Sequence, residues 1–231
     1  MLEALKKQVL EANLELPRLG LVDFTWGNVS GRDAASGAIV IKPSGVPYER
    51  MTEMDMVVLD ANGAVLDGKL KPSSDAPTHL ELYRAFPELG GIVHTHSSWA
   101  TVWAQACGGI PALGTTHADY FFGEIPCTKQ LTEQQIAGHY EAQTGVAIID
   151  CLHERGLTPT QMPAVLVANH GPFAWGADAD AAVHNAAVLE VVARMALLTL
   201  QMDGSVPAMP QQLLEKHFFR KHGPGAYYGQ G

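Results

Sequence analysis

A short segment with two histidines constrains this chain more than any other feature of its sequence. Residues 90–97 read GGIVHTHS, so a Gly-Gly turn is followed by β-branched apolar residues and then by His94 and His96. Side chains alternate between the two faces of a strand, and we therefore expect both imidazoles to lie on the same face. Two neutral nitrogen donors in fixed geometry suit a transition metal such as Zn²⁺.

His170 is the third candidate ligand. It follows an apolar run in residues 163–172, PAVLVANHGP, directly before a glycine. Three histidines at strand ends would leave one position on Zn²⁺ open, as in catalytic zinc sites. The alternative is that all three are ordinary core or loop histidines. We expect such structural or surface roles for six other histidines, which are His79, His117, His139, His153, His184 and His222.

The composition fits one folded domain spanning residues 1–231. Hydrophobic residues make up 47% of the chain and charged residues 17%, which is enough apolar material for a sizeable core and excludes global disorder. The formal net charge of −9 argues against a general nucleic-acid binder or a protein of anionic membrane surfaces. A phosphate-bearing substrate would have to be held locally, by backbone amides and a few placed cations.

Three further features predict a cytoplasmic protein. The cysteines, Cys107, Cys127 and Cys151, are odd in number and widely spaced, which favours buried, reduced thiols. The first 16 residues mix Glu and Lys through an amphipathic repeat, so we interpret them as a helix and not as a signal peptide. Residues 181–202 are strongly apolar but contain charged side chains, which favours a core helix over a membrane span.

Periodicity and turn signals predict an α/β domain with a central mixed or antiparallel sheet covered by helices. The expected helices are residues 2–16, 77–86, 98–106, 178–201 and 209–222, with a mixed helical region at 132–155. The expected strands are residues 22–28, 38–41, 56–59, 92–96 and 165–169.

Three turns of small residues join these elements. They read WGNVS at residues 26–30, KPSG at 42–45 and KPSSD at 71–75. Backbone amides and hydroxyls in such turns can surround phosphate oxygens, and Lys42 could supply a cation. Each turn alone is a weak signal, because Gly, Ser and Pro are common in loops. The three together favour a phosphate site.

The ordered set of motifs resembles the class II aldolase/epimerase family along the whole chain. The motifs are TWGNVS, IKPSG, KPSSD, GGIVHTHS, TTHADYF, NHGPFAWG and the terminal AYYGQ. Within the family they most resemble the epimerases that interconvert L-ribulose 5-phosphate and D-xylulose 5-phosphate. This resemblance implies a class II aldolase-like fold, one Zn²⁺ per chain, a phosphorylated ketopentose substrate, and a homotetramer with active sites between adjacent subunits.

The resemblance also assigns roles to individual residues. It implies that His94, His96 and His170 bind zinc, with Asp75 next to the metal and counted among its ligands. It implies that Asp119 and Tyr228 form an acid/base pair, with Tyr228 reaching in from a neighbouring subunit, and that His217 lies near that interface. The positions implied to bind substrate, chiefly its phosphate, are Gly27, Asn28, Lys42, Ser44, Gly45, Ser73 and Ser74.

The implied reaction explains these residue types. The C4 hydrogen of a 2-ketose is not adjacent to the carbonyl, so direct deprotonation at C4 is difficult. Breaking the C3–C4 bond instead leaves an enediolate whose charge a metal ion can stabilise. Rotation of the other fragment, glycolaldehyde phosphate, followed by recombination gives the other epimer. An acid/base group on each side serves the two directions of the C4 hydroxyl.

Two alternatives remain open. The first is a true aldolase of the same family, of the fuculose- or rhamnulose-phosphate type; those enzymes carry glutamate where this chain has Asp75. The second is a non-enzymatic interaction domain similar to the adducin head, which lacks the metal-binding histidines. The sequence leaves the metal itself open as well, since Mn²⁺ or Co²⁺ also suits three histidines.

Overall fold

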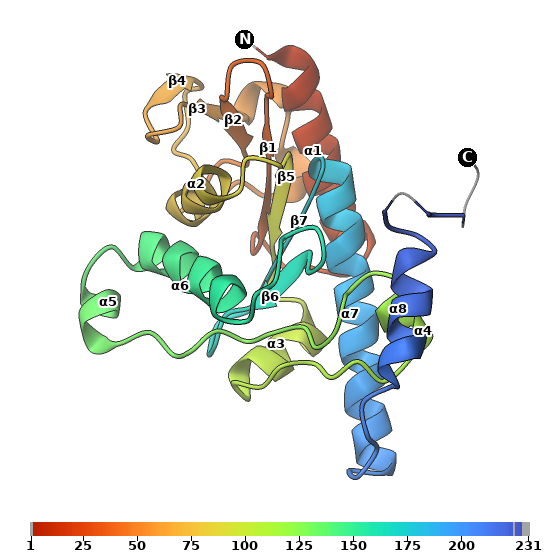
Figure 1. The fold of residues 1–231 in the computed structure, drawn as a ribbon. Helices are drawn as coiled ribbons and strands as arrows, with labels where there is room; N and C mark the ends of the chain where they lie inside the picture. Colours follow the sequence, from red (N-terminus) through yellow and green to blue (C-terminus); the bar gives the residue numbers. More distant parts are fainter. Residues whose placement is uncertain (1, 224, 228–231) are drawn as a thin grey trace.

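A seven-stranded antiparallel sheet forms the centre of the molecule. It is described here from a computed structural model that covers residues 2–223 and 225–227 (Figure 1). The strand order is β4-β3-β2-β1-β5-β7-β6. The strands are β1 (Asn28–Arg32), β2 (Ile39–Ile41), β3 (Val57–Leu59), β4 (Val65–Asp67), β5 (Gly91–His94), β6 (Ala164–Leu166) and β7 (Pro172–Gly176).

The sheet is antiparallel throughout these strands, so the mixed sheet among our expectations is wrong. The reason lies in the connections. β1 and β2, β3 and β4, and β6 and β7 are consecutive in the chain and joined by short turns. Short turns impose antiparallel pairing, whereas a parallel pair needs a crossover of a dozen residues or more.

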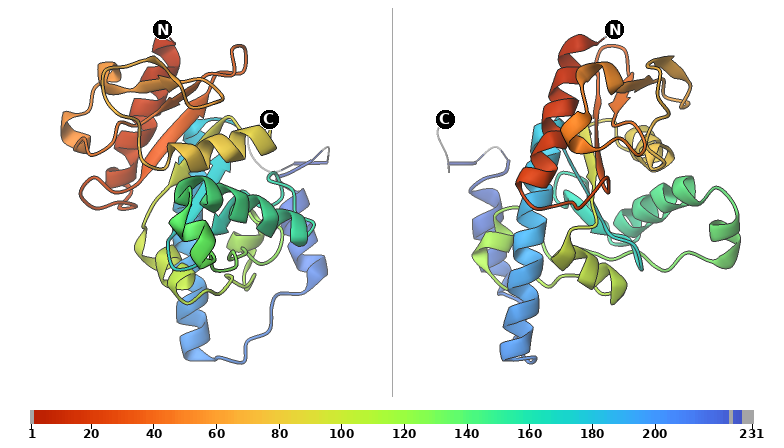
Figure 2. Two further views of the ribbon diagram at one scale, coloured as in Figure 1. Left: turned by 90° about the vertical axis from the view of Figure 1, so that its left-hand side faces the viewer. Right: turned by 180° about the vertical axis from the view of Figure 1, so that it is seen from behind.

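Helices cover both faces of the sheet (Figures 1 and 2). The long helix α7 packs on β5 and β7, and α1 packs on β1 beside it. The pair α2 and α6 covers the opposite face. The helices are α1 (Glu3–Arg18), α2 (Ala76–Ala85), α3 (Ser98–Gln105), α4 (Thr115–Ala118), α5 (Glu133–Ala137), α6 (Tyr140–Glu154), α7 (Ala179–Met202) and α8 (Gln211–Phe219), with 3-10 turns η1 (Tyr48–Arg50) and η2 (Glu53–Asp55).

The Gly-Gly pair before the histidines allows β5 to approach α7 closely. A Cβ atom on Gly91 would lie 2.2 Å from the carbonyl oxygen of Asp178, and one on Gly90 would lie 1.9 Å from that of Ala177. Asp178 caps α7, because its side chain accepts a hydrogen bond from the Ala181 amide at 2.8 Å. The two glycines therefore fix how the strand carrying His94 sits against the long helix.

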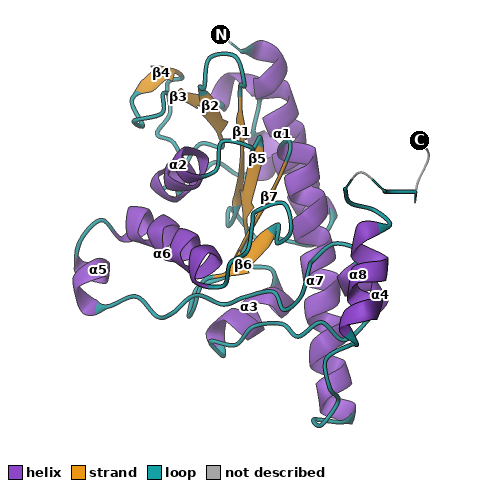
Figure 3. Cartoon of the chain, in the orientation of Figure 1, coloured by secondary structure: helices purple, strands orange, loops and turns teal. Residues whose placement is uncertain are grey.

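Most of the predicted helices are confirmed to within a few residues (Figure 3). The predicted strand at residues 22–28 is wrong, because the chain turns there and β1 begins only at Asn28. Phe24 and Gly27 adopt left-handed backbone conformations, with φ of 54° and 75°, which no strand accommodates. The strand predicted at 165–169 is β6, which is shorter and ends at Leu166. The sequence interpretation missed β4, α4 and β7; β7 begins with a proline directly after Gly171 and ends with Gly176.

By length and composition, α7 is apolar enough to cross a membrane. Eight of its residues are nevertheless buried against the protein core, among them Leu189, Val192 and Ala193. This packing fits the predicted core helix.

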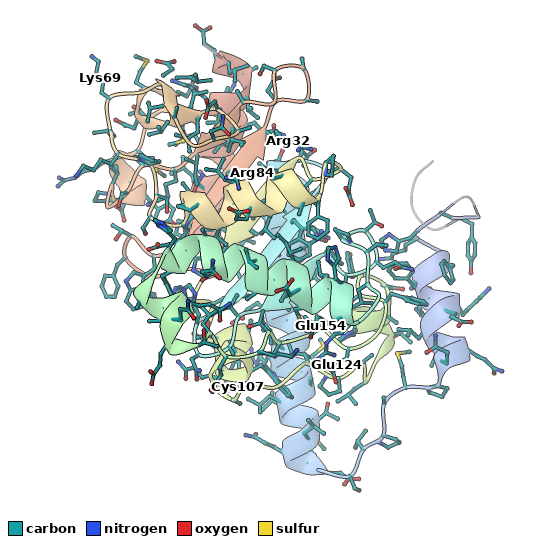
Figure 4. The ribbon with its side chains drawn as sticks, turned by 60° about the vertical axis from the view of Figure 1, so that its left-hand side comes forward. Arg32, Lys69, Arg84, Cys107, Glu124 and Glu154 are labelled. Atoms are coloured by element: carbon teal, nitrogen blue, oxygen red, sulfur yellow. The ribbon has the colours of Figure 1, made fainter. Side chains whose placement is uncertain are left out.

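The cysteines differ from expectation in one respect. Cys127 and Cys151 are buried, and burial raises the pKa of the Cys127 thiol to about 12. Cys107 is exposed in the turn that follows α3 (Figure 4), so the prediction of three buried thiols is wrong for this residue. Its φ of 54° places it in a turn at the protein surface.

Candidate functional site

The three predicted histidines converge at one end of the sheet. His94 is the last residue of β5, His96 follows two residues later, and His170 lies in the turn between β6 and β7. Because β5 pairs with β7, these segments are neighbours. The ring centroids are 4.9 Å apart for His94 and His96, 4.7 Å for His94 and His170, and 5.0 Å for His96 and His170. Their ligand nitrogens all lie within 4.8 Å of one another, so one metal ion could bind all three.

The surroundings keep these imidazoles neutral, as metal binding requires. Burial lowers the pKa of His94 to about 3 and also lowers the pKa values of His96 and His170. His94 Nδ1 lies 2.9 Å from the carbonyl oxygen of Pro172, which can only accept a hydrogen bond. Nδ1 therefore carries the proton and the Nε2 lone pair is available as a ligand. His170 Nδ1 is buried and has no hydrogen-bond partner among the described residues.

A cavity of about 620 Å³ opens beside the histidines. Of the twelve predicted metal and substrate residues, all but His217 line it; these are Gly27, Asn28, Lys42, Ser44, Gly45, Ser73, Ser74, Asp75, His94, His96 and His170. Of the other lining residues, Thr25, Trp26 and Pro43 belong to motifs that the sequence had indicated, whereas sequence reasoning did not single out Tyr140 and Glu141. Tyr140 and Glu141 begin α6, and no local pattern indicates that this helix end reaches the cavity.

Two of the small-residue turns are joined to each other at the cavity wall. The Ser44 amide donates to the carbonyl oxygen of Lys71 at 2.9 Å, and the Ser73 amide donates to that of Lys42 at 2.9 Å. Gly27 lies next to the end of β5, where a Cβ atom would approach the His94 carbonyl oxygen to 2.9 Å. Glycine is therefore required for this close approach. The turns and the histidines thus form one continuous wall.

Lys42 is the cation of this wall. Its side chain is buried, with 2% of the residue exposed, and burial lowers its pKa. In the described part of the chain, no carboxylate lies within 4.0 Å of its Nζ atom. A buried ammonium without a paired carboxylate is costly unless an anion compensates for it. The arrangement suits a bound oxyanion.

Asp75 also lines the cavity, at the N-terminal end of α2. Its Oδ2 atom accepts a hydrogen bond from Asn28 Nδ2 at 2.6 Å. Burial alone would raise the pKa of Asp75, but the pKa is lowered, and the hydrogen bond from Asn28 acts in this direction. Asp75 is not in the group of ligand atoms within 4.8 Å of one another, so its predicted part in metal binding stays a prediction.

Asp119 and His217 lie together, but not among the residues that line this cavity. Asp119 follows α4 and forms a two-point ion pair with Arg220, with distances of 3.0 Å to Nε and 2.7 Å to Nη2. His217 Nδ1 lies 2.9 Å from the same carboxylate, and Lys221 Nζ lies 3.5 Å away. Burial opposes ionisation, but the hydrogen bonds from Arg220 and His217 lower the pKa of Asp119. Tyr228 is outside the described residues.

Comparison with known families identifies the chain. The model of the class II aldolase and adducin N-terminal domain matches residues 7–197. The chain belongs to this family. Class II aldolases depend on a metal ion, and the histidine group could hold one.

Solved structures with the same fold include sugar-phosphate aldolases. An L-fuculose 1-phosphate aldolase is 25% identical, with a TM-score of 0.79 over 94% of this chain and 95% of that one. The L-fuculose-1-phosphate aldolase from Thermus thermophilus is 23% identical, with a TM-score of 0.67 over 89% of this chain and 98% of that one. A sugar-phosphate aldolase from Thermotoga maritima is 19% identical, with a TM-score of 0.65 over 90% and 98%. The last two likenesses concern the fold alone.

Proposed function

We propose that this protein is a metal-dependent epimerase that interconverts L-ribulose 5-phosphate and D-xylulose 5-phosphate. One observation carries the proposal: a single cavity joins three neutral histidines to a buried lysine and its serine- and glycine-rich turns. The histidines suit a divalent cation, and the lysine with the turns suits a phosphate. Substrates that need both a metal and a phosphate site are the sugar phosphates of this family.

The identity of residue 75 favours epimerisation over aldol cleavage. An aldolase must protonate the enediolate carbon and release both products, and the family resemblance implies a glutamate at this position in the aldolases. Asp75 is one methylene shorter, and its carboxylate is engaged by Asn28 at 2.6 Å. Such a carboxylate is better suited to orienting groups around the metal than to reaching a substrate carbon.

In the proposed mechanism the metal site, the phosphate site and the acid/base pair have separate roles. Zn²⁺ bound by His94, His96 and His170 would supply Lewis acidity for the negative charge that develops when the C3–C4 bond breaks. Lys42 and the turns at residues 42–45 and 71–75 hold the phosphate, so the cleaved two-carbon fragment stays in the cavity while its carbonyl group rotates to present the opposite face. Asp119 and Tyr228 are the proposed acid/base pair for the two orientations of the C4 hydroxyl.

We propose that the working enzyme is a homotetramer, with active sites between adjacent subunits. Asp119 and His217 do not line the cavity of their own chain, so each cavity would have to receive these two residues from a neighbouring subunit. An unpartnered apolar stripe on α7 supports assembly. Its residues Val191, Met195, Leu198 and Met202 recur at helical spacing and are between 41% and 90% exposed.

Phosphorylated sugars are intermediates of the cytoplasm, which we propose as the compartment.

The decisive experiment incubates the zinc-loaded protein with L-ribulose 5-phosphate. We expect D-xylulose 5-phosphate to form with little free glycolaldehyde phosphate, because an epimerase retains the fragment. If free fragments accumulate faster than the epimer forms, the epimerase proposal is wrong.

A class II sugar-phosphate aldolase is the second candidate. The 25% identity to an L-fuculose 1-phosphate aldolase over almost the whole of both chains favours it. Incubation with L-fuculose 1-phosphate or L-rhamnulose 1-phosphate tests this candidate, since cleavage releases dihydroxyacetone phosphate. A non-enzymatic interaction domain would purify without stoichiometric metal, so elemental analysis separates that possibility from both enzymes.

A further inference from the structure

The ammonium group of Lys42 makes only long hydrogen bonds. Its hydrogen-bond acceptors are the carbonyl oxygens of Thr25 and Pro43, both at 3.4 Å. An ammonium can donate three hydrogen bonds, and 3.4 Å is long for each of them. Something else must therefore hold this buried group in place and offset part of its lost hydration.

The ring of Tyr48 occupies that position. Lys42 Nζ lies 4.9 Å from the centre of the ring, within the range in which an aromatic face attracts a cation. Tyr48 begins the 3-10 turn η1 and is buried, with 3% of the residue exposed. A desolvated cation over an aromatic ring is the setting in which this attraction is strongest.

The hydroxyl of Tyr48 fixes the ring against the cavity wall. It lies 2.6 Å from the carbonyl oxygen of Trp26 and 3.0 Å from that of Gly27. Burial raises the pKa of Tyr48, so the hydroxyl keeps its proton and donates. Trp26 and Gly27 both line the cavity, whereas Tyr48 does not. One side chain outside the cavity thus connects the loop at residues 25–28 to the lysine of the anion site.

We propose that Tyr48 is a positioning residue for phosphate binding, acting through Lys42. Its ring keeps the Lys42 ammonium directed toward the cavity. Its hydroxyl fixes the position of the ring relative to the loop at residues 26–27. This inference rests on the proposed function, because it assumes that Lys42 binds the substrate phosphate. A tyrosine that only fills space in the core would need neither a cation over its ring nor carbonyl partners for its hydroxyl.

Two variants at position 48 separate the ring from the hydroxyl and from packing. Tyr48→Phe keeps the aromatic face, and Tyr48→Met keeps apolar volume without that face; Tyr48→Leu replaces Tyr48→Met if the latter does not fold. The matched control is Tyr83→Met. Tyr83 is also a buried tyrosine with a cation over its ring, Arg32 at 5.3 Å, but it does not line or contact the anion site.

The test measures binding of 2-phosphoglycolate to the zinc-loaded protein by calorimetry, with glycolate as the phosphate-free probe. We expect Tyr48→Met to weaken 2-phosphoglycolate binding about tenfold, an effect between those of exposed and fully desolvated cation–π contacts. Tyr48→Phe should stay within about threefold of wild type. Glycolate binding and zinc content should not change in either variant, and Tyr83→Met should bind both probes as wild type does.

A double-mutant cycle shows whether Tyr48 acts through the lysine. In a Lys42→Met background, Tyr48→Met should weaken 2-phosphoglycolate binding no further. Full additivity, or a Tyr48→Phe variant as weak as Tyr48→Met, would overturn the positioning role. Loss of affinity in Lys42→Met with none in Tyr48→Met contradicts only the inference about Tyr48. Unchanged affinity in Lys42→Met contradicts the phosphate site of the proposed function itself.

Discussion

At the scale of single residues, the three histidines carry the clearest prediction. His94, His96 and His170 supply ligand atoms within 4.8 Å of one another, so replacing any of them by asparagine should remove most of the bound metal. Elemental analysis of purified protein measures this directly. His184→Asn is the matched control, because His184 is exposed on α7 and is not in the group. Full metal occupancy in His94→Asn would exclude the assignment.

Lys42 makes a prediction about substrate affinity. Removing its charge in Lys42→Met should raise KM by an order of magnitude or more, because a charge-assisted hydrogen bond contributes roughly 1.5–3 kcal/mol. The neighbouring Lys71 begins the second KPS turn but is exposed and does not line the cavity. Lys71→Met should therefore leave KM within about twofold. Steady-state kinetics with L-ribulose 5-phosphate measures both variants, and equal values of KM for Lys42→Met and wild type would place the phosphate elsewhere.

At the scale of elements, the contact between β5 and α7 depends on a glycine. A Cβ atom on Gly91 would lie 2.2 Å from the carbonyl oxygen of Asp178, and the obstacle is backbone that cannot rotate away. Gly91→Ala should lower the free energy of unfolding by about 1–3 kcal/mol or more. At Gly108 the nearest atom to an added Cβ is a Trp103 ring carbon at 3.9 Å, so Gly108→Ala is the control. Urea unfolding measures both variants; equal stability would mean that the two elements can separate freely.

The exposed stripe on α7 gives a prediction about assembly. A charge in the middle of an apolar contact is strongly unfavourable, so Met195→Glu should shift the protein from tetramer toward smaller species. Met54, in η2, is exposed to 79% and is not part of the stripe, so Met54→Glu should leave the mass unchanged. Light scattering after size-exclusion chromatography measures the mass. A monomeric wild type would contradict the proposed assembly.

At the scale of the whole molecule, buried histidines make stability depend on pH. Burial lowers the pKa of His79 and His117 to about 4 and that of His94 to about 3, while an unfolded histidine titrates near pH 6.5. Between these values the unfolded state binds protons that the folded state excludes. The free energy of unfolding of the metal-free protein should therefore fall as the pH drops from about 6.5 toward 4. These three groups contribute up to ~4 kcal/mol per pH unit, and the lowered pKa values of His96 and His170 add to the slope.

Urea unfolding at several pH values in the presence of a chelator measures this slope. His117→Gln should reduce it by up to about 1.4 kcal/mol per pH unit, the contribution of one titrating group. His184→Gln, at an exposed position, should leave it unchanged. A free energy of unfolding that stays constant from pH 7 to pH 5 would contradict the neutral, buried state of these imidazoles.

Local pattern by itself determined most of the helices and the identity of the main site. The 3.6-residue periodicity placed α1, α2, α3 and α7, because an amphipathic or core helix records its packing in its own sequence. Motif spacing identified the histidines and the three turns that line the cavity. The loop at residues 22–27 was misread as a strand, because its apolar residues are those of a strand, whereas Phe24 and Gly27 adopt left-handed backbone conformations.

Only the tertiary structure decided how these pieces combine. Antiparallel pairing of β5 with β7 brings His170 to His94, and no local signal contains that register. The entry of Tyr140 and Glu141 into the cavity depends on where α6 packs. The ion pair between Asp119 and Arg220, 101 residues apart, joins α4 to α8 and lies away from the cavity residues. Sequence specifies the chemistry of each group, but long-range contacts decide which groups meet, because their pairing depends on the packing of the whole chain.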